Sequence, residues 1–173
     1  MKHLILGAAL AGALASAGCT PVPQSADELR QVTSRGAVMT AKDSYTVPRS
    51  FGAVSGSLRR GADRCLTVTS SQGIMARGPM GMGHVQQIRK HHMTTVRTVD
   101  GRTELMIKTR VQGAILVGGG ADNSGIMFLA DATPSGGSTR MDIYGGSWGT
   151  AELRGAVKRW AGGGSILPCP QMP

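Results

Sequence analysis

The chain has 173 residues, with 19 Lys and Arg against 10 Asp and Glu, which gives a formal net charge of +9. Its aromatic residues are two Phe, two Tyr and two Trp, and only Tyr144 and Trp148 lie near each other in the sequence. The composition therefore indicates no cluster of aromatic side chains of the kind that stacks on sugars or bases.

The N-terminus has the pattern of a secretory signal. A short basic start precedes Leu4–Ala17, an apolar run that is too short to cross a bilayer, which takes roughly 20 apolar residues. Small residues close this run directly before Cys19, and Ala15–Ala17 also fits an ordinary secretory cleavage site. The sequence therefore predicts an exported protein with a signal peptide over residues 1–18.

Ala17, Gly18 and Cys19 resemble the signal of bacterial lipoproteins, in which small residues precede a cysteine that is acylated and becomes the first residue of the mature protein. The resemblance implies a lipid on Cys19 that anchors the chain to a membrane. Thr20 resembles the outer-membrane class, because Asp at that place favours the inner membrane in enterobacterial lipoproteins. We therefore expect a cell-envelope protein at the outer membrane, facing the periplasm.

The other two cysteines depend on that expectation. With lipid on Cys19, Cys65 and Cys169 remain of the three cysteines, and an exported protein can hold them as a disulfide. Two buried free thiols are the alternative. Export also argues against nucleic acid as the target of the positive charge. The positive charge can instead serve to bind an anionic envelope component or an envelope protein, or it can simply make the surface generally basic.

Residues 19–43 are polar and rich in Pro, Ser and Thr, and we expect the lipidated N-terminus and a linker there. Ser25 and Glu28 have the spacing of a capping box, so a short helix can begin at Ser25, although little apolar surface would dock it. A single domain of residues 44–173 follows.

The domain begins with a strand at Tyr45–Val47 and a helix after Pro48. Next come a strand at Leu66–Ser70 and a Gly- and Met-rich loop over residues 71–84. The helix has one apolar stripe, formed by Phe51, Val54, Leu58 and Ala62.

Asp100-Gly101 is a two-residue hairpin signal between long strands at residues 85–99 and 102–117. The turn sets the register and gives the sheet one apolar face and one basic face. The expected apolar face pairs Val96 with Leu105, Thr94 with Ile107 and His92 with Thr109. The expected basic face pairs Arg97 with Glu104, Met93 with Lys108 and His91 with Arg110.

Strands at residues 125–131 and 138–144 and a helix at residues 150–161 complete the pattern. The inner stripe of the helix is Leu153, Ala156, Val157 and Trp160. We expect an α+β domain of two layers, an antiparallel sheet of five or six strands with two helices packed on one face. This order resembles the helix-grip arrangement, including small domains of the lipoprotein C subunit of the outer-membrane barrel assembly machine.

The basic sheet face is the main candidate for partner binding, through Arg97, Lys108, Arg110 and His91, although such a face can also be merely solvated. The chemical alternative is copper, because Met80, Met82 and His84 supply soft ligands on one loop. His91 and His92 are adjacent in a strand and must point to opposite faces, so they cannot chelate together.

The sequence contains no constellation typical of catalysis. A Gly-x-Ser-x-Gly elbow is missing, and Gly118–Gly120 lacks the ending of a phosphate-binding loop. Asp131 and Asp142 lie on neighbouring expected strands and could approach each other, but a solvated or Arg140-paired role fits them better than acid–base work.

Together these patterns predict a lipid-anchored periplasmic domain that binds or scaffolds, without cofactor, resident metal or enzymatic activity. Besides the lipid-mediated contact with a membrane, its partner would be an anionic envelope component or an envelope protein. A carrier of a small ligand, held in a groove between sheet and helices, is one alternative. Copper handling by the Met and His cluster is the other.

Overall fold

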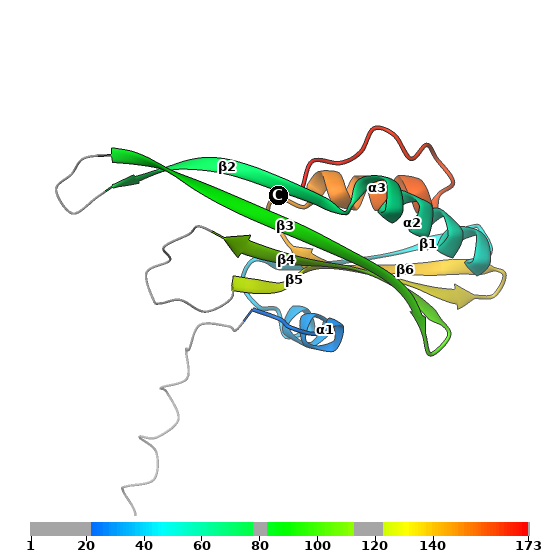
Figure 1. The fold of residues 1–173 in the computed structure, drawn as a ribbon. Helices are drawn as coiled ribbons and strands as arrows, with labels where there is room; N and C mark the ends of the chain where they lie inside the picture. Colours follow the sequence, from blue (N-terminus) through cyan, green and yellow to red (C-terminus); the bar gives the residue numbers. More distant parts are fainter. Residues whose placement is uncertain (1–21, 78–82, 113–122, 173) are drawn as a thin grey trace, which may run out of the picture.

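The computed structural model describes residues 22–77, 83–112 and 123–172. These residues form an antiparallel sheet of six strands in the order β1-β6-β5-β4-β3-β2, together with three helices (Figure 1). The α+β class and the antiparallel sheet are as predicted. In chain order the elements are α1 (Ala26–Ser34), β1 (Thr40–Val47), α2 (Phe51–Cys65), β2 (Val68–Arg77), β3 (Gly83–Val99), β4 (Arg102–Gln112), β5 (Asn123–Ser135), β6 (Ser138–Gly146) and α3 (Ala151–Ala161).

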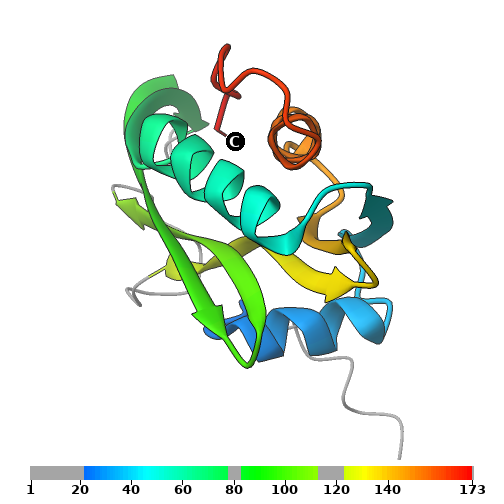
Figure 2. The ribbon, with the colours of Figure 1, turned by 90° about the vertical axis from the view of Figure 1, so that its right-hand side faces the viewer.

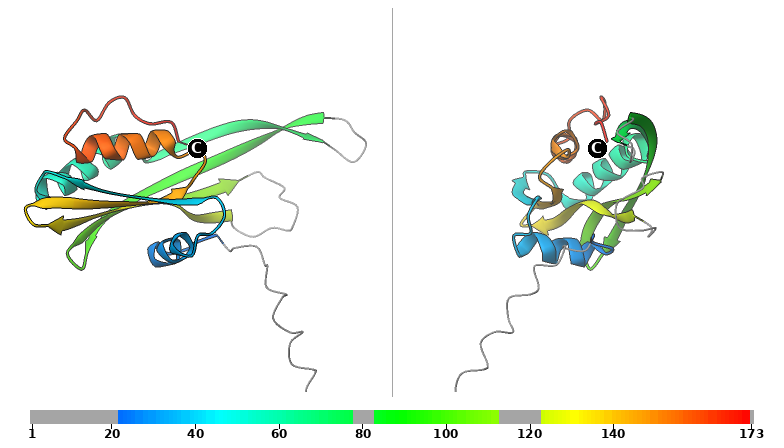
Figure 3. Two further views of the ribbon diagram at one scale, coloured as in Figure 1. Left: turned by 180° about the vertical axis from the view of Figure 1, so that it is seen from behind. Right: turned by 90° about the vertical axis from the view of Figure 1, so that its left-hand side faces the viewer.

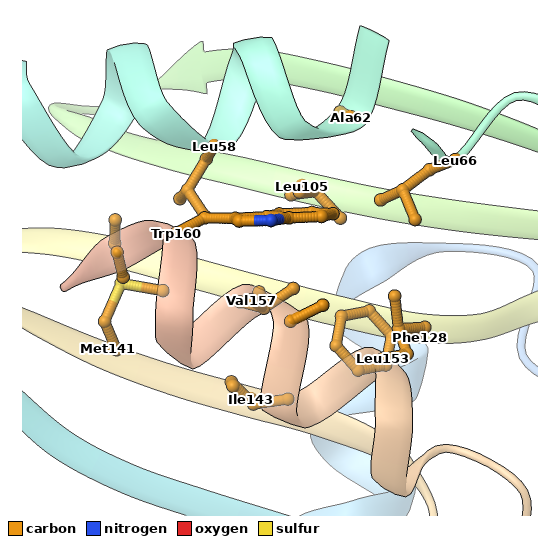
Figure 4. Packing of buried hydrophobic residues seen from close by; sticks show 14 of the residues in the cluster. Leu58, Ala62, Leu66, Leu105, Phe128, Met141, Ile143, Leu153, Val157 and Trp160 are labelled. Carbon is orange, nitrogen blue, oxygen red and sulfur yellow. The ribbon is translucent and has the colours of Figure 1, made fainter. Parts of the chain in front are cut away.

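Helices α2 and α3 lie side by side on one face of the sheet, called here the core face, as predicted (Figure 2). Their apolar stripes are buried against alternate residues of the central strands, which is the burial pattern expected of a sheet with one covered face. Trp160 of α3 is fully buried and lies beside Leu58 and Leu105 (Figure 4). A Cβ atom on Gly61 of α2 would come within 2.3 Å of the Trp160 ring, so the absence of a side chain there lets the two helices approach.

The β3–β4 hairpin has the predicted register. Val96 lies opposite Leu105, Thr94 opposite Ile107 and His92 opposite Thr109, and these residues belong to the core face. Asp100 and Gly101 both have positive φ, 50° and 74°, as a two-residue turn that follows the strand twist requires.

Helix α1 packs on the opposite face of the sheet, called here the α1 face (Figure 3). The sequence predicts two layers and a linker up to residue 43, whereas residues 22–43 belong to the folded domain. Leu29 and Ala26 are buried there, and the chain before the helix is held by hydrogen bonds from Ile126 N to Pro23 O (2.8 Å) and from Gln24 Nε2 to Ser124 O (2.6 Å). The polar composition of this segment predicted a linker. That prediction was wrong because a few apolar side chains and one ion network suffice to dock a nine-residue helix.

The hairpin of β2 and β3 is longer than the sequence predicts. β2 continues to Arg77 and β3 begins at Gly83, within the segment expected to be a loop. Together they form a hairpin that projects beyond the helices (Figure 1). The Gly- and Met-rich sequence of this segment favours a loop. The hydrogen bonds between the paired strands outweigh that local preference and keep the segment extended.

Cys65 at the end of α2 and Cys169 in the C-terminal tail form the predicted disulfide, with a Cα–Cα distance of 5.2 Å. The bond ties the tail across α2 and α3, where Trp160 Nε1 also donates to Ile166 O (3.1 Å). None of the helices in the described part of the chain is long and apolar enough to cross a membrane.

Candidate functional site

Helix α1 begins at a capping box, as the sequence predicts. The Ser25 hydroxyl accepts a hydrogen bond from Glu28 N (3.1 Å), and the Glu28 carboxylate accepts one from Gln24 N (2.6 Å). The first bond satisfies a backbone donor that the first turn of a helix leaves unpaired, and the second holds Gln24, the residue before the N-cap. They fix where α1 starts and therefore which of its sides meets the sheet.

The inner side of α1 closes a second, smaller core on the α1 face. Ala26 and Leu29 are buried there against three residues of the sheet, Ile126 and Leu129 on β5 and Tyr144 on β6. Val32 and Met106 pack at its edge. This core explains why a helix of mostly polar residues is stably placed over β5 and β6.

Three carboxylates form a row across the α1 face. Glu104 on β4 lies opposite Asp131 on β5, and Asp131 lies opposite Asp142 on β6. Like charges directly opposite each other destabilise a sheet, so this row needs cations. Basic side chains from α1 and from the same strands provide them.

Arg30 of α1 joins two of these carboxylates. Its Nε and Nη2 atoms donate to the two oxygens of Asp131, both at 2.8 Å, and Nη2 also binds Glu104. Glu104 is almost completely buried and receives further hydrogen bonds from Arg97 Nε (2.8 Å) and Arg102 Nε (3.1 Å). Burial by itself would raise the pKa of Glu104, but the hydrogen bonds from Arg30 and Arg97 outweigh it, and the pKa is lowered.

Asp142 has its own set of partners. Lys42 Nζ lies 3.3 Å and Arg140 Nε 3.1 Å from its carboxylate, and the Ser44 hydroxyl donates to it as well. Burial acts to raise the pKa of Asp142, and the hydrogen bonds from Ser44 and Arg140 lower it below its usual value. The predicted pairing with Arg140 is confirmed. Each acid of the row therefore has a cationic partner, which is the arrangement of a structural ion network.

The four basic residues expected at a partner-binding face do share the α1 face. His91 lies opposite Arg110 and Lys108 opposite Met93, which is 47% exposed. The His91 ring also lies within hydrogen-bond distance of Thr69 Oγ1 (3.1 Å) and Gln112 Oε1 (3.3 Å). Arg97 differs from the other three, because its guanidinium is bound to Glu104 and belongs to the ion network.

An apolar pocket of about 370 Å³, which was not predicted from the sequence, opens beside α1. Its walls come from four separate segments: the chain before α1, α1 with the following loop, the start of β5, and the β6–α3 connection. The lining residues are Val22, Pro23, Leu29, Val32, Ala37, Val38, Thr40, Ile126, Met127, Gly146, Trp148 and Thr150. The one local sign in the sequence is Trp148, an aromatic residue set in a Gly- and Ser-rich turn.

The copper alternative falls largely outside the described residues. Met80 and Met82 are not described, and neither is the side chain of His84. His91 and His92 do lie on opposite faces: His92 is buried on the core face, with Nδ1 2.9 Å from Thr109 Oγ1. Within residues 22–77, 83–112 and 123–172, no three His, Cys, Asp or Glu side chains are grouped as metal ligands would be.

The groove expected for a small-ligand carrier is filled where Trp160 lies. The indole occupies the space between α2, α3 and the sheet, and neighbouring Leu58, Leu105 and Val157 are completely buried (Figure 4). A ligand between α2 and α3 would have to displace this side chain.

Comparison of the chain with protein-family models, with curated proteins and with solved structures finds no match. Function is therefore inferred from the residues of the chain itself.

Proposed function

We propose that the chain is an acylated lipoprotein of the bacterial cell envelope, whose periplasmic domain binds or scaffolds a partner without catalysing a reaction. The observation that carries the proposal is the division of the three cysteines. Cys65 and Cys169 are joined to each other, and Cys19 stands alone, directly after an apolar run of signal-peptide length.

The disulfide supports export. Stable disulfides are rare in reducing cytosol and common in the bacterial periplasm. The bond between Cys65 and Cys169 closes a sequence separation of 104 residues, so it is an integral part of the folded chain. Acylation of Cys19 then accounts for an odd number of cysteines without leaving a free thiol in an oxidising compartment.

The binding role rests on the α1 face. Lys108, Arg110 and His91 lie together on β3 and β4, to one side of the ion network. We place the contact with an anionic envelope component, such as a phosphate- or carboxylate-bearing polymer, or with an acidic envelope protein, at these residues. The ion network joins α1 to the sheet beside them.

One observation favours a second candidate. The pocket beside α1, at about 370 Å³, is within the size range of pockets that hold small ligands. A carrier function would therefore use this pocket, rather than the groove between sheet and helices that was expected from the sequence.

The anchor is tested on the full chain expressed in a bacterial host. Mass spectrometry of the mature protein should find Cys19 as the first residue, carrying acyl chains, and the membrane fraction should hold the protein. Cys19→Ser is the matched control, because it keeps Cys65 and Cys169 and should lose both the acyl mass and the membrane association. An uncleaved, unmodified form dissolved in the cytosol would refute the proposal.

The partner site is tested by chemical crosslinking in intact cells. Lys108→Glu with Arg110→Glu should reduce the recovery of any envelope component that the wild-type protein captures. Arg60→Glu with Arg64→Glu makes the same change in net charge at two exposed positions of α2, and should leave recovery unchanged. Equal capture by both variants would show that the partner does not bind at Lys108 and Arg110.

A further inference from the structure

Three apolar residues that line the pocket beside α1 are well exposed, and a fourth exposed apolar residue, Met39, directly follows one of them in the chain. Val22, Val38, Met39 and Trp148 are 60%, 89%, 63% and 80% exposed, and they are four of the seven large hydrophobic residues exposed in the described part of the chain. We call these four the apolar rim. Exposed apolar residues scattered singly are ordinary on a protein surface, but a contiguous group around an apolar pocket marks an interaction site.

The backbone holds the rim in place. Ser147 N donates to Met39 O (2.8 Å), which joins the α1–β1 loop to the β6–α3 connection. Met39 has φ 67°, a conformation that costs free energy in a residue with a side chain, and Gly149 beside Trp148 has φ 73°. The two loops are thus fixed to each other, and their apolar side chains stay exposed beside the pocket.

The rim is also the part of the domain next to the proposed anchor. Val22 is itself a rim residue, and the chain after it is held to β5 through Pro23 O. Three peptide units separate Val22 from Cys19, so even a fully extended chain spans only about 11 Å. Because a lipid on Cys19 lies in the bilayer, this short reach brings the membrane surface to the apolar rim.

We propose that the apolar rim docks into the surface of the bilayer that holds the lipid of Cys19, a step that rests on the proposed acylation. Trp148 is the central contact, because an indole is most stable where an apolar environment meets water. No charged residue lines the pocket, so the entry of phospholipid tails does not strip water from an ion. Arg35 is exposed in the loop that carries Val38 and Met39 and is available to lipid phosphates.

Docking gives the anchored domain a fixed orientation on the membrane. With the rim in the bilayer surface, α1 and the two loops lie against the membrane, while the projecting β2–β3 hairpin and the C-terminal tail lie elsewhere on the domain (Figure 1). The protein would then present the same surfaces to every partner in the periplasm.

Tryptophan fluorescence tests this in the full acylated protein, reconstituted in vesicles of phosphatidylethanolamine and phosphatidylglycerol. The chain has two tryptophans, and Trp160 is completely buried in the core. Entry of Trp148 into the bilayer should shift its emission to the blue, and brominated phospholipids should quench that emission. Both effects should leave Trp160 unaffected. Trp148→Phe should abolish the quenching while the protein still floats with the vesicles.

The outcomes separate docking from anchoring. If the protein does not float with the vesicles, acylation fails and the proposed function fails with it. If it floats, but Trp148 stays unquenched, the rim does not enter the bilayer and this inference is wrong. That second result would also follow if one of the protein's own acyl chains filled the pocket.

A photocrosslinking amino acid at position 148 in living cells provides the independent check, with Asp63 on α2 as the control position. Adducts with phospholipid at 148 and not at 63 would support docking. Adducts at 148 with a protein, including a second copy of this chain, would show that a protein covers the rim and would overturn the inference.

Discussion

Arg30 and Asp131 form a two-pronged ion pair, in which the guanidinium Nε and Nη2 each donate to one carboxylate oxygen at 2.8 Å. The pair joins α1 to β5 across a sequence separation of 101 residues. Both side chains are largely shielded from water, at 17% and 6% exposure. When one partner of such a pair is removed, water cannot reach the remaining charge to solvate it.

We therefore expect Arg30→Met to destabilise the protein by about 3 kcal/mol, the lower end of the range for breaking a buried ion pair, because Glu104 keeps Arg97 and Arg102. Urea unfolding measures the change. The matched control is Arg35→Met, the same substitution at an exposed position just after α1, where less than about 0.5 kcal/mol is expected. A loss of equal size in the two variants would show that the ion network adds nothing of its own.

Two glycines of α2 should respond oppositely to alanine. A Cβ on Gly61 would lie 2.3 Å from the Trp160 ring, so Gly61→Ala forces two packed helices apart and should cost about 1–3 kcal/mol. Gly52 has no atom within 4 Å of the same position, and Gly52→Ala should stabilise the helix by up to about 1 kcal/mol. Thermal unfolding of both variants gives the sign directly, and stabilisation by Gly61→Ala would mean that the two helices are less closely packed than described.

The disulfide should contribute substantially to stability. Loss of a crosslink that closes about 100 residues frees the unfolded chain and costs about 2–5 kcal/mol. Cys65→Ser with Cys169→Ser should lower the free energy of unfolding by that amount. Added reductant should lower the stability of wild type and leave the double variant unchanged. Wild type and double variant of equal stability would contradict the prediction.

His92 should make the protein less stable in mild acid. Burial, with smaller effects from Lys90 and His91, lowers the pKa of His92 below its usual 6.5, and its Nε2 is buried without a hydrogen-bond partner among the described residues. The unfolded state therefore binds the proton more readily, so the free energy of unfolding should fall as the pH is lowered below about 6.5.

Urea unfolding at pH 7.5 and 5.5 measures this pH dependence. His92→Gln should remove most of the difference between the two pH values. His91→Gln keeps His92 and serves as the control. If the pH dependence persists in His92→Gln, groups other than His92 cause it.

Much of the fold follows from local patterns in the sequence. Asp100-Gly101 sets the register of β3 and β4, and the stripes of Leu58 and Trp160 direct α2 and α3 to one face. The disulfide follows from cysteine counting, once Cys19 is set aside. These features depend on residues close together in sequence or on a small number of possible pairings.

The ion network and the pocket on the α1 face could not be predicted in the same way. Arg30, Glu104 and Asp131 come from distant segments, and no periodicity connects them. Leu29 is the one strongly apolar side chain of α1 that is fully buried, with Val32 only partly buried beside it, so the composition favoured a linker. The pocket beside α1 likewise exists only after four segments meet.

The pairing of β1 with β6 has a consequence for how the protein is made. Thr40 at the beginning of the sheet lies beside Gly146 at its end, so the first strand cannot find its neighbour until nearly the whole polypeptide is available. Such long-range closure is slow compared with the formation of helices and hairpins. A chain threaded through a translocation pore from its N-terminus would therefore arrive as an open meander, and its first strand would be the last to join the sheet.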